Sequence, residues 1–259
     1  MIDAEKVLID GRPTKPSAKI RVGQQITVRL PKLEPVHLKP ESIPLDILYE
    51  DESLAILNKQ SDLVIHPSRG HLSGTLVNGL LAHFENLSDY HEDVFRPGIV
   101  HRLDRFTSGI LLIAKNAQAH AILSAQFENR EIKKEYLALV EGEMRFEEGT
   151  ISLPLGIDPK NRERVAVRHN GKEAVTDYRV MARYPGYTLV HVFPKTGRTH
   201  QIRVHLKSQG HPIVADQLYG ATPSLDAGAL FQKANKICAT ENRSEEHTYE
   251  LQSRQSISY

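Results

Sequence analysis

The sequence predicts an α+β fold in which a mixed, largely antiparallel sheet is flanked by helices. Strand-length runs that are apolar or alternate with a period of two occur at residues 54–57, 109–114, 136–140, 175–184 and 187–193. Segments with apolar residues three or four apart, as on one face of a helix, occur at residues 75–84, 116–130 and 199–210. Several strands follow one another without a helix between them, which excludes a regular alternation of strand and helix.

Residues 1–33 are predicted to form a small β-rich module. Residues 7–9 lead into the turn Asp10-Gly11-Arg12-Pro13, and residues 26–30 alternate as a half-buried strand should. This segment is too short for an independent hydrophobic core. Prolines at positions 31, 35, 40 and 44 stiffen the chain that follows, so we expect a Pro-rich linker at residues 34–44.

The segments after the linker contain residues that mark where helices begin and end. The continuous apolar run at residues 109–114 is typical of a strand that is buried on both faces. Asn116 is a suitable N-cap for a helix that places Ile122 and other apolar side chains on one face. Thr199 is expected to cap a third helix, which Gly210 ends.

The formal net charge of +1 conceals an uneven distribution of charge along the chain. Residues 1–40 hold 8 basic and 4 acidic side chains, residues 41–100 hold 3 and 10, and residues 151–221 hold 11 and 5. Clustered Lys and Arg side chains favour a surface that binds polyanions such as nucleic acid. Patches on an ordinary solvated surface explain the same counts, so charge alone does not decide between the two.

Several classes of protein are excluded by what the sequence lacks. The single cysteine, Cys238, rules out a disulfide framework or a multi-thiolate metal site, and His200, His205 and His211 lack the spacing of a helical metal site. The sequence contains neither a nucleotide-binding glycine motif nor a nucleophile elbow. It also contains no apolar run of the roughly 18 residues that a spanning helix needs. We therefore expect a soluble, cytoplasmic protein without metal, cofactor or membrane association.

Two clusters combine turn, charge and apolar signals. Residues 98–109 form a glycine-bounded loop with Asp104 at its centre, leading into the predicted strand. A carboxylate held on such a loop suits a nucleophile or general base, although an ion pair with Arg102 or Arg105 is the simpler interpretation. Residues 195–206 place basic and amide side chains after a glycine. These could bind phosphates or pair with a buried carboxylate, or form a solvated helix face.

Four segments in order resemble the RluA-type family of RNA pseudouridine synthases. They are residues 57–67, the loop His101-Arg102-Leu103-Asp104 with Thr107-Ser108-Gly109, residues 134–138, and residues 196–206 followed by Asp216 and Tyr219-Gly220. The resemblance spans about residues 45–221, which we expect to form the catalytic domain with the pseudouridine synthase fold. Gln60, Asp62 and Phe106 depart from the residues usual in the family. Asp62 stands where glycine is usual and would be strained if φ there is positive.

The two ends of the chain resemble the family less. Residues 1–33 are similar to the latter part of an S4 RNA-binding domain, so we expect a truncated S4-like module. Residues 222–259 lack an alternating apolar pattern, and residues 243–253 resemble the translation of a sequencing-library adapter. We expect this tail to be an assembly artefact or disordered.

The resemblance implies a reaction that breaks the C1′–N1 bond of uridine and rejoins the base through C5. It implies that Asp104 either attacks C1′ or abstracts the 2′ proton, and that Arg203 pairs with it. Tyr136 resembles the tyrosine that stacks on the target base, and Arg102 the arginine that enters the RNA stack when the uridine flips out. A simpler interpretation is that Tyr136 is an aromatic residue of the core and that Arg102 contacts a phosphate.

The resemblance also implies further contacts with RNA and leaves an alternative open. We expect RNA-binding residues in the two clusters, namely His101, Arg102, Arg105, Arg198, His200 and Gln201. The expected partner is RNA, with large-subunit ribosomal RNA favoured over transfer RNA because of the S4-like segment, and the expected state is a monomer. The alternative is a non-catalytic RNA-binding or ribosome-assembly protein on the same scaffold.

Overall fold

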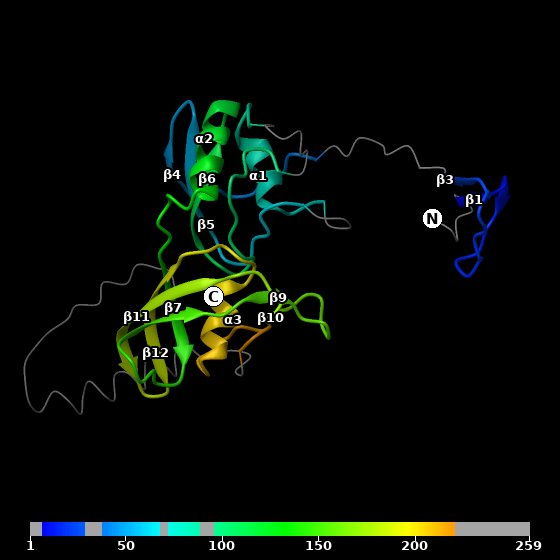
Figure 1. The fold of residues 1–259 in the computed structure, drawn as a ribbon. Helices are drawn as coiled ribbons and strands as arrows, with labels where there is room; N and C mark the ends of the chain where they lie inside the picture. The colour runs from blue at the N-terminus through cyan, green and yellow to red at the C-terminus, as the bar shows by residue number, and fades with distance from the viewer. Residues whose placement is uncertain (1–6, 29–37, 68–71, 89–95, 221–259) are drawn as a thin grey trace, which may run out of the picture. The chain divides into compact units, whose positions relative to one another are not determined.

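The computed structural model describes residues 7–28, 38–67, 72–88 and 96–220 (Figure 1). The chain divides into two compact units, Met1–His37 and Leu38–Tyr259. Every strand pair among the described residues is antiparallel, and helices accompany the sheets, so the predicted α+β class is confirmed. The predicted tail at residues 222–259 lies outside the described residues. Within the described ranges, no helix has the length and apolar character needed to cross a membrane.

The smaller unit contains one three-stranded sheet. Its strands are β1 (Val7–Ile9), β2 (Arg12–Pro13) and β3 (Ile26–Val28), in the order β2-β1-β3. Asp10 and Gly11 both have positive φ, 49° and 78°, which is the backbone of a tight two-residue hairpin turn. The expected half-buried alternation of residues 26–30 is wrong for β3, whose residues are all exposed because it is an edge strand of a very small sheet.

The larger unit begins with a sheet and two helices. The sheet has the order β4-β5-β6, and its elements are β4 (Ile47–Glu50), β5 (Leu54–Lys59) and β6 (Gly109–Ala114), with α1 (Leu76–His83) and α2 (Ala117–Glu128). Helix α2 packs beside β6 (Figure 1). The expectation that residues 109–114 are buried on both faces is wrong, since Ile110 is 54% exposed. The pleat turns Ile110 away from the buried face that Leu111 and Ile113 share.

Both helices begin where the sequence predicts. Thr75 caps α1 through a reciprocal capping box with Asn78, and the Asn116 side chain accepts a hydrogen bond of 2.9 Å from the Ala119 amide at the start of α2. The buried face of α2 runs through its small Ala119, so Ile122 is left 52% exposed despite its helical spacing.

The second half of the larger unit is mostly strand. It contains β7 (Tyr136–Glu141), β8 (Glu148–Ser152), β9 (Leu155–Ile157), β10 (Val165–Val167), β11 (Val175–Tyr184), β12 (Tyr187–Pro194) and α3 (Gln201–Ser208). Four of these strands form a sheet in the order β7-β12-β11-β8, and β9 pairs with β10. The N-cap of α3 is His200 with a left-handed φ of 54°, so the expected cap at Thr199 is wrong by one residue.

Two main apolar cores hold these elements together. The first is built from β5, β6, α1 and neighbouring loops and contains Leu57, Leu76, Leu80, Leu111 and Ile113. The second is built from β7, β8, β11, β12 and α3 and contains Val140, Ile151, Val190, Val192 and Leu206. Tyr136, at the start of β7, packs against both cores and therefore links them.

Part of the predicted linker packs on the larger unit. The Glu41 amide donates to the Asn78 carbonyl at 2.9 Å, and the Asn78 side chain donates to the Lys39 carbonyl at 2.9 Å. Ile43 lies against Gly79 of α1, where an added Cβ would meet it at 3.0 Å. This segment is thus attached to α1 by these hydrogen bonds and by Ile43, which packs against the first core.

Candidate active site

The Asp104 loop, residues 101–108, leads directly into β6. Leu103 is 7% exposed and belongs to the first core, which fixes the loop just before Asp104. The Thr107 amide donates to the Asp104 carbonyl at 3.1 Å and tightens the turn. The side chain of Asp104 is 23% exposed. A buried neighbour thus places the carboxylate in a defined, partly open position.

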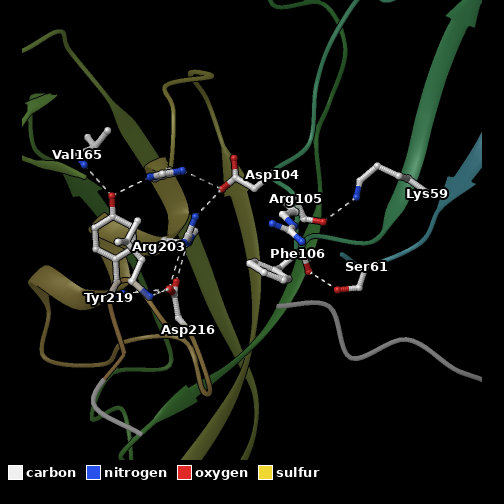
Figure 2. Close-up of polar contacts among 11 residues, drawn as sticks. Lys59, Ser61, Asp104, Arg105, Phe106, Val165, Arg203, Asp216 and Tyr219 are labelled. Atoms are coloured by element: carbon white, nitrogen blue, oxygen red, sulfur yellow. Dashed lines mark hydrogen bonds and ion pairs between the residues drawn. The ribbon is translucent and has the colours of Figure 1, made fainter. Parts of the chain in front are cut away.

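Lys59, the last residue of β5, anchors the Asp104 loop through hydrogen bonds. Its Nζ donates to the carbonyls of Gln60, Leu63 and Arg105 at 2.8, 3.0 and 3.0 Å, as Figure 2 shows for Arg105. Burial lowers the pKa of Lys59 to about 8, against the opposing charges of Asp104 and Asp62. The side chain therefore remains protonated at pH 7, with three donors for three carbonyls.

Arg203 of α3 joins two carboxylates. Its Nε and Nη2 donate to the two oxygens of Asp216 at 2.7 and 2.8 Å, and Nη1 donates to Asp104 at 3.1 Å (Figure 2). Burial alone would lower the pKa of Arg203, but the hydrogen bonds and charges of the two carboxylates raise it. The pKa of Asp216 is lowered, because its bonds from Arg203 and from two backbone amides outweigh burial. The bidentate pair with Asp216 thus aims the remaining edge of the guanidinium at Asp104.

His200 lies on the other side of the Asp104 carboxylate. Its Nε2 is 4.0 Å from Asp104, and its Nδ1 is 2.8 Å from the Tyr219 hydroxyl. That hydroxyl accepts a bond of 2.7 Å from the Val165 amide, which leaves its own proton for Nδ1 (Figure 2). Burial lowers the pKa of His200, with Asp104 and Arg203 acting in opposite directions. A neutral imidazole in this arrangement carries its proton on Nε2, facing Asp104.

Asp104 lies where two cavities meet. One has a volume of about 490 Å³ and is lined by Tyr136, Arg198 and Lys134, and the other has about 950 Å³ and is lined by Phe106. The residues shared by both linings are Arg102, Leu103, Asp104, Thr107, His200 and Arg203. A substrate entering from either side would reach the same carboxylate.

Tyr136 forms part of the wall of the smaller cavity. Its ring is half-buried between the two cores. Burial raises the pKa of its hydroxyl, and the charge of Asp104 raises it further. The phenol is therefore neutral at pH 7 and keeps a proton to donate beside the carboxylate.

Two predicted RNA-binding residues make close contacts within the scaffold. His101 stacks on Phe127 at 4.4 Å between ring centroids and accepts a bond of 2.9 Å from the Leu112 amide. Burial, followed by the charge of Lys134, lowers the pKa of His101 to about 4, so it carries no charge for a phosphate at pH 7.

Gln201 is the second of these residues. It is 4% exposed, and its amide group accepts from Thr196 and Arg198 and donates to Val175 and Thr176. These four bonds fill the hydrogen-bonding capacity of a glutamine side chain. His101 and Gln201 both line the smaller cavity, and their contact with RNA stays a prediction.

The three predicted arginines differ in how much of the guanidinium is already bound within the protein. Arg102 is exposed, lines both cavities, and has no hydrogen bond or ion pair to the described part of the chain. Arg198 lines the smaller cavity, and its Nε donates a hydrogen bond of 3.0 Å to the Glu173 carbonyl. Arg105 lines the larger cavity, and its Nε donates a hydrogen bond of 2.7 Å to the Asp62 carboxylate. Asp62 has a φ of 61°, the conformation that the sequence marked as strained for a non-glycine residue.

Three residues of the site were absent from the predicted set. Asp216 and Lys59 lie in the recognised segments, but a lone carboxylate or lysine in a sequence does not reveal which partner it will hold. Lys134 lines the smaller cavity, and burial together with the charge of Arg130 lowers its pKa. It precedes β7, which begins at Tyr136, and its place in the recognised segment 134–138 was the available signal. Within the described ranges, no three His, Cys, Asp or Glu side chains converge as metal ligands.

Comparison with known proteins identifies relatives of the chain. A family model described as RNA pseudouridylate synthase matches residues 53–208. The chain is 50% identical over 208 residues to an uncharacterized RNA pseudouridine synthase of Aquifex aeolicus (strain VF5), covering 80% of this chain and 66% of that protein. It is 41% identical over 226 residues to ribosomal large subunit pseudouridine synthase D of Escherichia coli (strain K12), covering 87% of this chain and 68% of that protein. The chain thus spans about two thirds of the length of both relatives.

A solved structure shares the fold. The human RNA pseudouridylate synthase domain containing 1 matches with a TM-score of 0.57 and 30% sequence identity, covering 73% of each chain. The human RNA pseudouridylate synthase domain containing 4 matches with a TM-score of 0.55 over 72% of this chain and 75% of that chain. At 24% identity, this second match supports the fold alone.

Proposed function

This chain belongs to the RNA pseudouridylate synthase family, and we propose that it isomerises specific uridines to pseudouridine in large-subunit ribosomal RNA, with Asp104 acting on the uridine. One observation carries the assignment of Asp104. Its carboxylate lies at the junction of two cavities, 23% exposed, and receives a hydrogen bond of 3.1 Å from Arg203. A partly open carboxylate with a fixed guanidinium partner is suited to act on a bound nucleotide.

The proposed reaction is an isomerisation in which no atom is gained or lost. The C1′–N1 bond breaks, a C1′–C5 bond forms, the proton on C5 is released, and N1 takes up a proton. Asp104 either attacks C1′ or removes the 2′ proton, and both routes need its ionised form. Arg203 supports that form through its charge, while Tyr136 has a neutral hydroxyl beside the reacting base.

Access to Asp104 requires the uridine to leave its helix or loop. A base that is stacked inside RNA cannot reach a carboxylate recessed between two cavities, so base flipping is part of the proposal. The smaller cavity, of about 490 Å³, provides space beside Tyr136. Arg102 has no hydrogen-bond or ion-pair partner in the described part of the chain, and we propose that it fills the vacated position in the stack.

The choice of RNA rests on a relative. The Escherichia coli protein to which this chain is 41% identical is named for the large ribosomal subunit. Arg102, Arg198 and Lys134 line the cavities and supply positive charge for the phosphate backbone. A cytoplasmic location, a monomeric state and the S4-like nature of residues 1–33 remain predictions.

The test is to incubate the chain with transcripts of large-subunit ribosomal RNA and of transfer RNA and to map pseudouridine at single-nucleotide resolution. We expect the wild type to modify ribosomal uridines, and Asp104→Asn to form none while it binds the same RNA as tightly. Asp177→Asn, on the exposed side of β11, is the matched control and should retain full activity. Turnover by a clean Asp104→Asn preparation would contradict the assignment. RNA binding without any pseudouridine in the wild type would favour the non-catalytic alternative.

A further inference from the structure

Phe106 is an exposed aromatic side chain that the proposed reaction does not use. It lies two residues after Asp104 and is 37% exposed. Its ring lines the larger cavity, which Asp104 also lines. A large apolar side chain held at the mouth of a cavity next to the reacting carboxylate is a candidate contact for the substrate.

The backbone that carries Phe106 is fixed from one side. The Phe106 carbonyl accepts a hydrogen bond of 2.9 Å from the Ser61 hydroxyl, and the Arg105 carbonyl accepts one of 3.0 Å from Lys59 (Figure 2). The Leu63 amide also donates to the Arg105 carbonyl at 3.2 Å. These bonds tie residues 105 and 106 to the end of β5, so the ring is held on an ordered support.

The guanidinium of Arg105 lies beside the ring of Phe106. Its central carbon is 5.1 Å from the ring centroid, within the range of a cation–π contact. Arg105 is held by Asp62, 2.7 Å from its Nε, and this carboxylate balances its charge. The pair therefore offers a flat, oriented surface with little excess charge, which fits a planar base better than a phosphate.

The surroundings of this pair match a nucleotide next to the reacting one. The cavity has a volume of about 950 Å³, and its lining includes apolar Val64 and Leu218 as well as the cations Arg102 and Arg203. When a uridine flips towards Asp104, its neighbour loses a stacking partner. An aromatic side chain recovers that stacking for any base, because every base has a π-face.

We propose that Phe106, with Arg105 beside it, is a stacking platform for one unpaired RNA base adjacent to the uridine at Asp104. The proposal rests on the proposed function and extends it to a subsite for the neighbouring nucleotide. Phe106 positions RNA and takes no part in bond making, so its loss should weaken binding and leave kcat at saturating RNA unchanged.

The chain contains no tryptophan, which provides a direct optical test. Phe106→Trp introduces a single indole at the platform, and Phe146→Trp introduces one at a matched position. Phe146 is 65% exposed, has the neighbouring Arg145 guanidinium 5.7 Å from its centroid, and lines neither cavity. On addition of the large-subunit ribosomal RNA transcript, we expect fluorescence quenching with Phe106→Trp and none with Phe146→Trp. Absence of quenching with Phe106→Trp under conditions where the RNA binds would overturn the proposal.

Removal of the ring provides a second test. Phe106→Ala should raise Kd and KM for the transcript about tenfold, with kcat unchanged, whereas Phe146→Ala should change none of them. An abasic nucleotide next to the mapped uridine should weaken binding to the wild type but add no further loss with Phe106→Ala. Wild-type Kd for Phe106→Ala, or equal abasic losses in the two proteins, would contradict the platform.

The two proposals fail in distinguishable ways. If the wild type binds RNA but forms no pseudouridine, while Phe106→Ala still weakens binding, the proposed function fails and the platform stands. If pseudouridine forms and Phe106→Ala leaves Kd and KM unchanged, the platform fails and the function stands. Failure of the wild type to bind either transcript would overturn both.

Discussion

The orientation of a side chain at the site is fixed by a second residue that binds it. Arg203 faces Asp104 with one N–H, while two others are taken by Asp216. Arg203→Lys keeps the charge but removes the planar fork, so an ammonium cannot hold both carboxylates in this geometry. We expect about a 10- to 100-fold loss of kcat, the worth of a charge-assisted hydrogen bond of about 1.5–3 kcal/mol.

The control for this prediction is Arg179→Lys, because Arg179 is 68% exposed and its pair with Glu148 is 3.4 Å long. That variant should keep wild-type kinetics, since exposed pairs contribute little. Rates should be measured at saturating RNA with unfolding followed in parallel. A wild-type rate for Arg203→Lys would show that only the charge of Arg203 matters.

Protonation of His101 makes the free energy of unfolding depend on pH. Burial lowers its folded pKa to about 4, below the value of 6.5 for an exposed imidazole. Below pH 6.5 the unfolded chain therefore binds a proton that the folded chain does not, so stability is lost as pH falls from 6.5 towards 4. Between pH 7 and pH 5, we expect a loss of about 2 kcal/mol from this residue.

The measurement is the free energy of unfolding in denaturant at both pH values. His101→Gln keeps an acceptor for the Leu112 amide but cannot titrate, so its stability should fall less than that of the wild type by about 2 kcal/mol. An equal fall in both proteins would place the titrating group elsewhere.

At the scale of elements, the sequence predicted what depends on local patterns. The range of β11 and the cap Asn116 agree with it, because alternation and capping act over a few residues. The exposure of Ile110 and Ile122 could not be read locally, since it depends on which face a distant element covers. For the same reason the pairing of Arg203 with Asp216 was missed, although Arg203 itself was named.

Anchoring of the Asp104 loop by Lys59 is a tertiary contact of this kind. Lys59→Met keeps the length of the side chain and leaves carbonyls near the end of β5 without their donor. Unpaired buried carbonyls cost roughly 1–3 kcal/mol, so we expect a comparable loss in the free energy of unfolding. We also expect kcat to fall about tenfold or more, because a shift of about 1 Å in Asp104 is costly.

The matched control is Lys115→Met, just beyond the other end of the same sheet. Lys115 pairs with Glu50 at 2.7 Å and follows the end of β6 opposite to the one that the Asp104 loop enters. It should lose stability without losing kcat. If Lys59→Met and Lys115→Met lose stability alike and both keep wild-type kcat, Lys59 has no positioning role.

At the scale of the larger unit, the candidate site is assembled from two cores. The first core supports Asp104 through Leu103, and the second supports Arg203 through α3. The family that the sequence resembles is confirmed by the match over residues 53–208, which includes both halves. Through this resemblance, the sequence could name residues from both halves. Spacing alone could not show that Asp104 and Arg203 meet, because they are 99 positions apart.

Tyr136 is the residue that packs against both cores and also faces the smaller cavity. Two substitutions separate these roles. Tyr136→Ala removes the ring and should lower the free energy of unfolding by about 3 kcal/mol, because a cavity opens between the cores. Tyr136→Phe keeps the ring and should leave stability unchanged. If the neutral hydroxyl takes part in proton transfer, kcat for Tyr136→Phe should fall about 100-fold.

Unfolding in denaturant and single-turnover rates on the mapped RNA measure both effects. Tyr184→Ala is the control for loss of an aromatic ring, because Tyr184 is 39% exposed at the end of β11 and should cost little. A wild-type rate for Tyr136→Phe would restrict Tyr136 to stacking on the base. Unchanged stability of Tyr136→Ala would show that the two cores hold their arrangement without this ring, and the Asp104–Arg203 contact would then depend on the ion pairs alone.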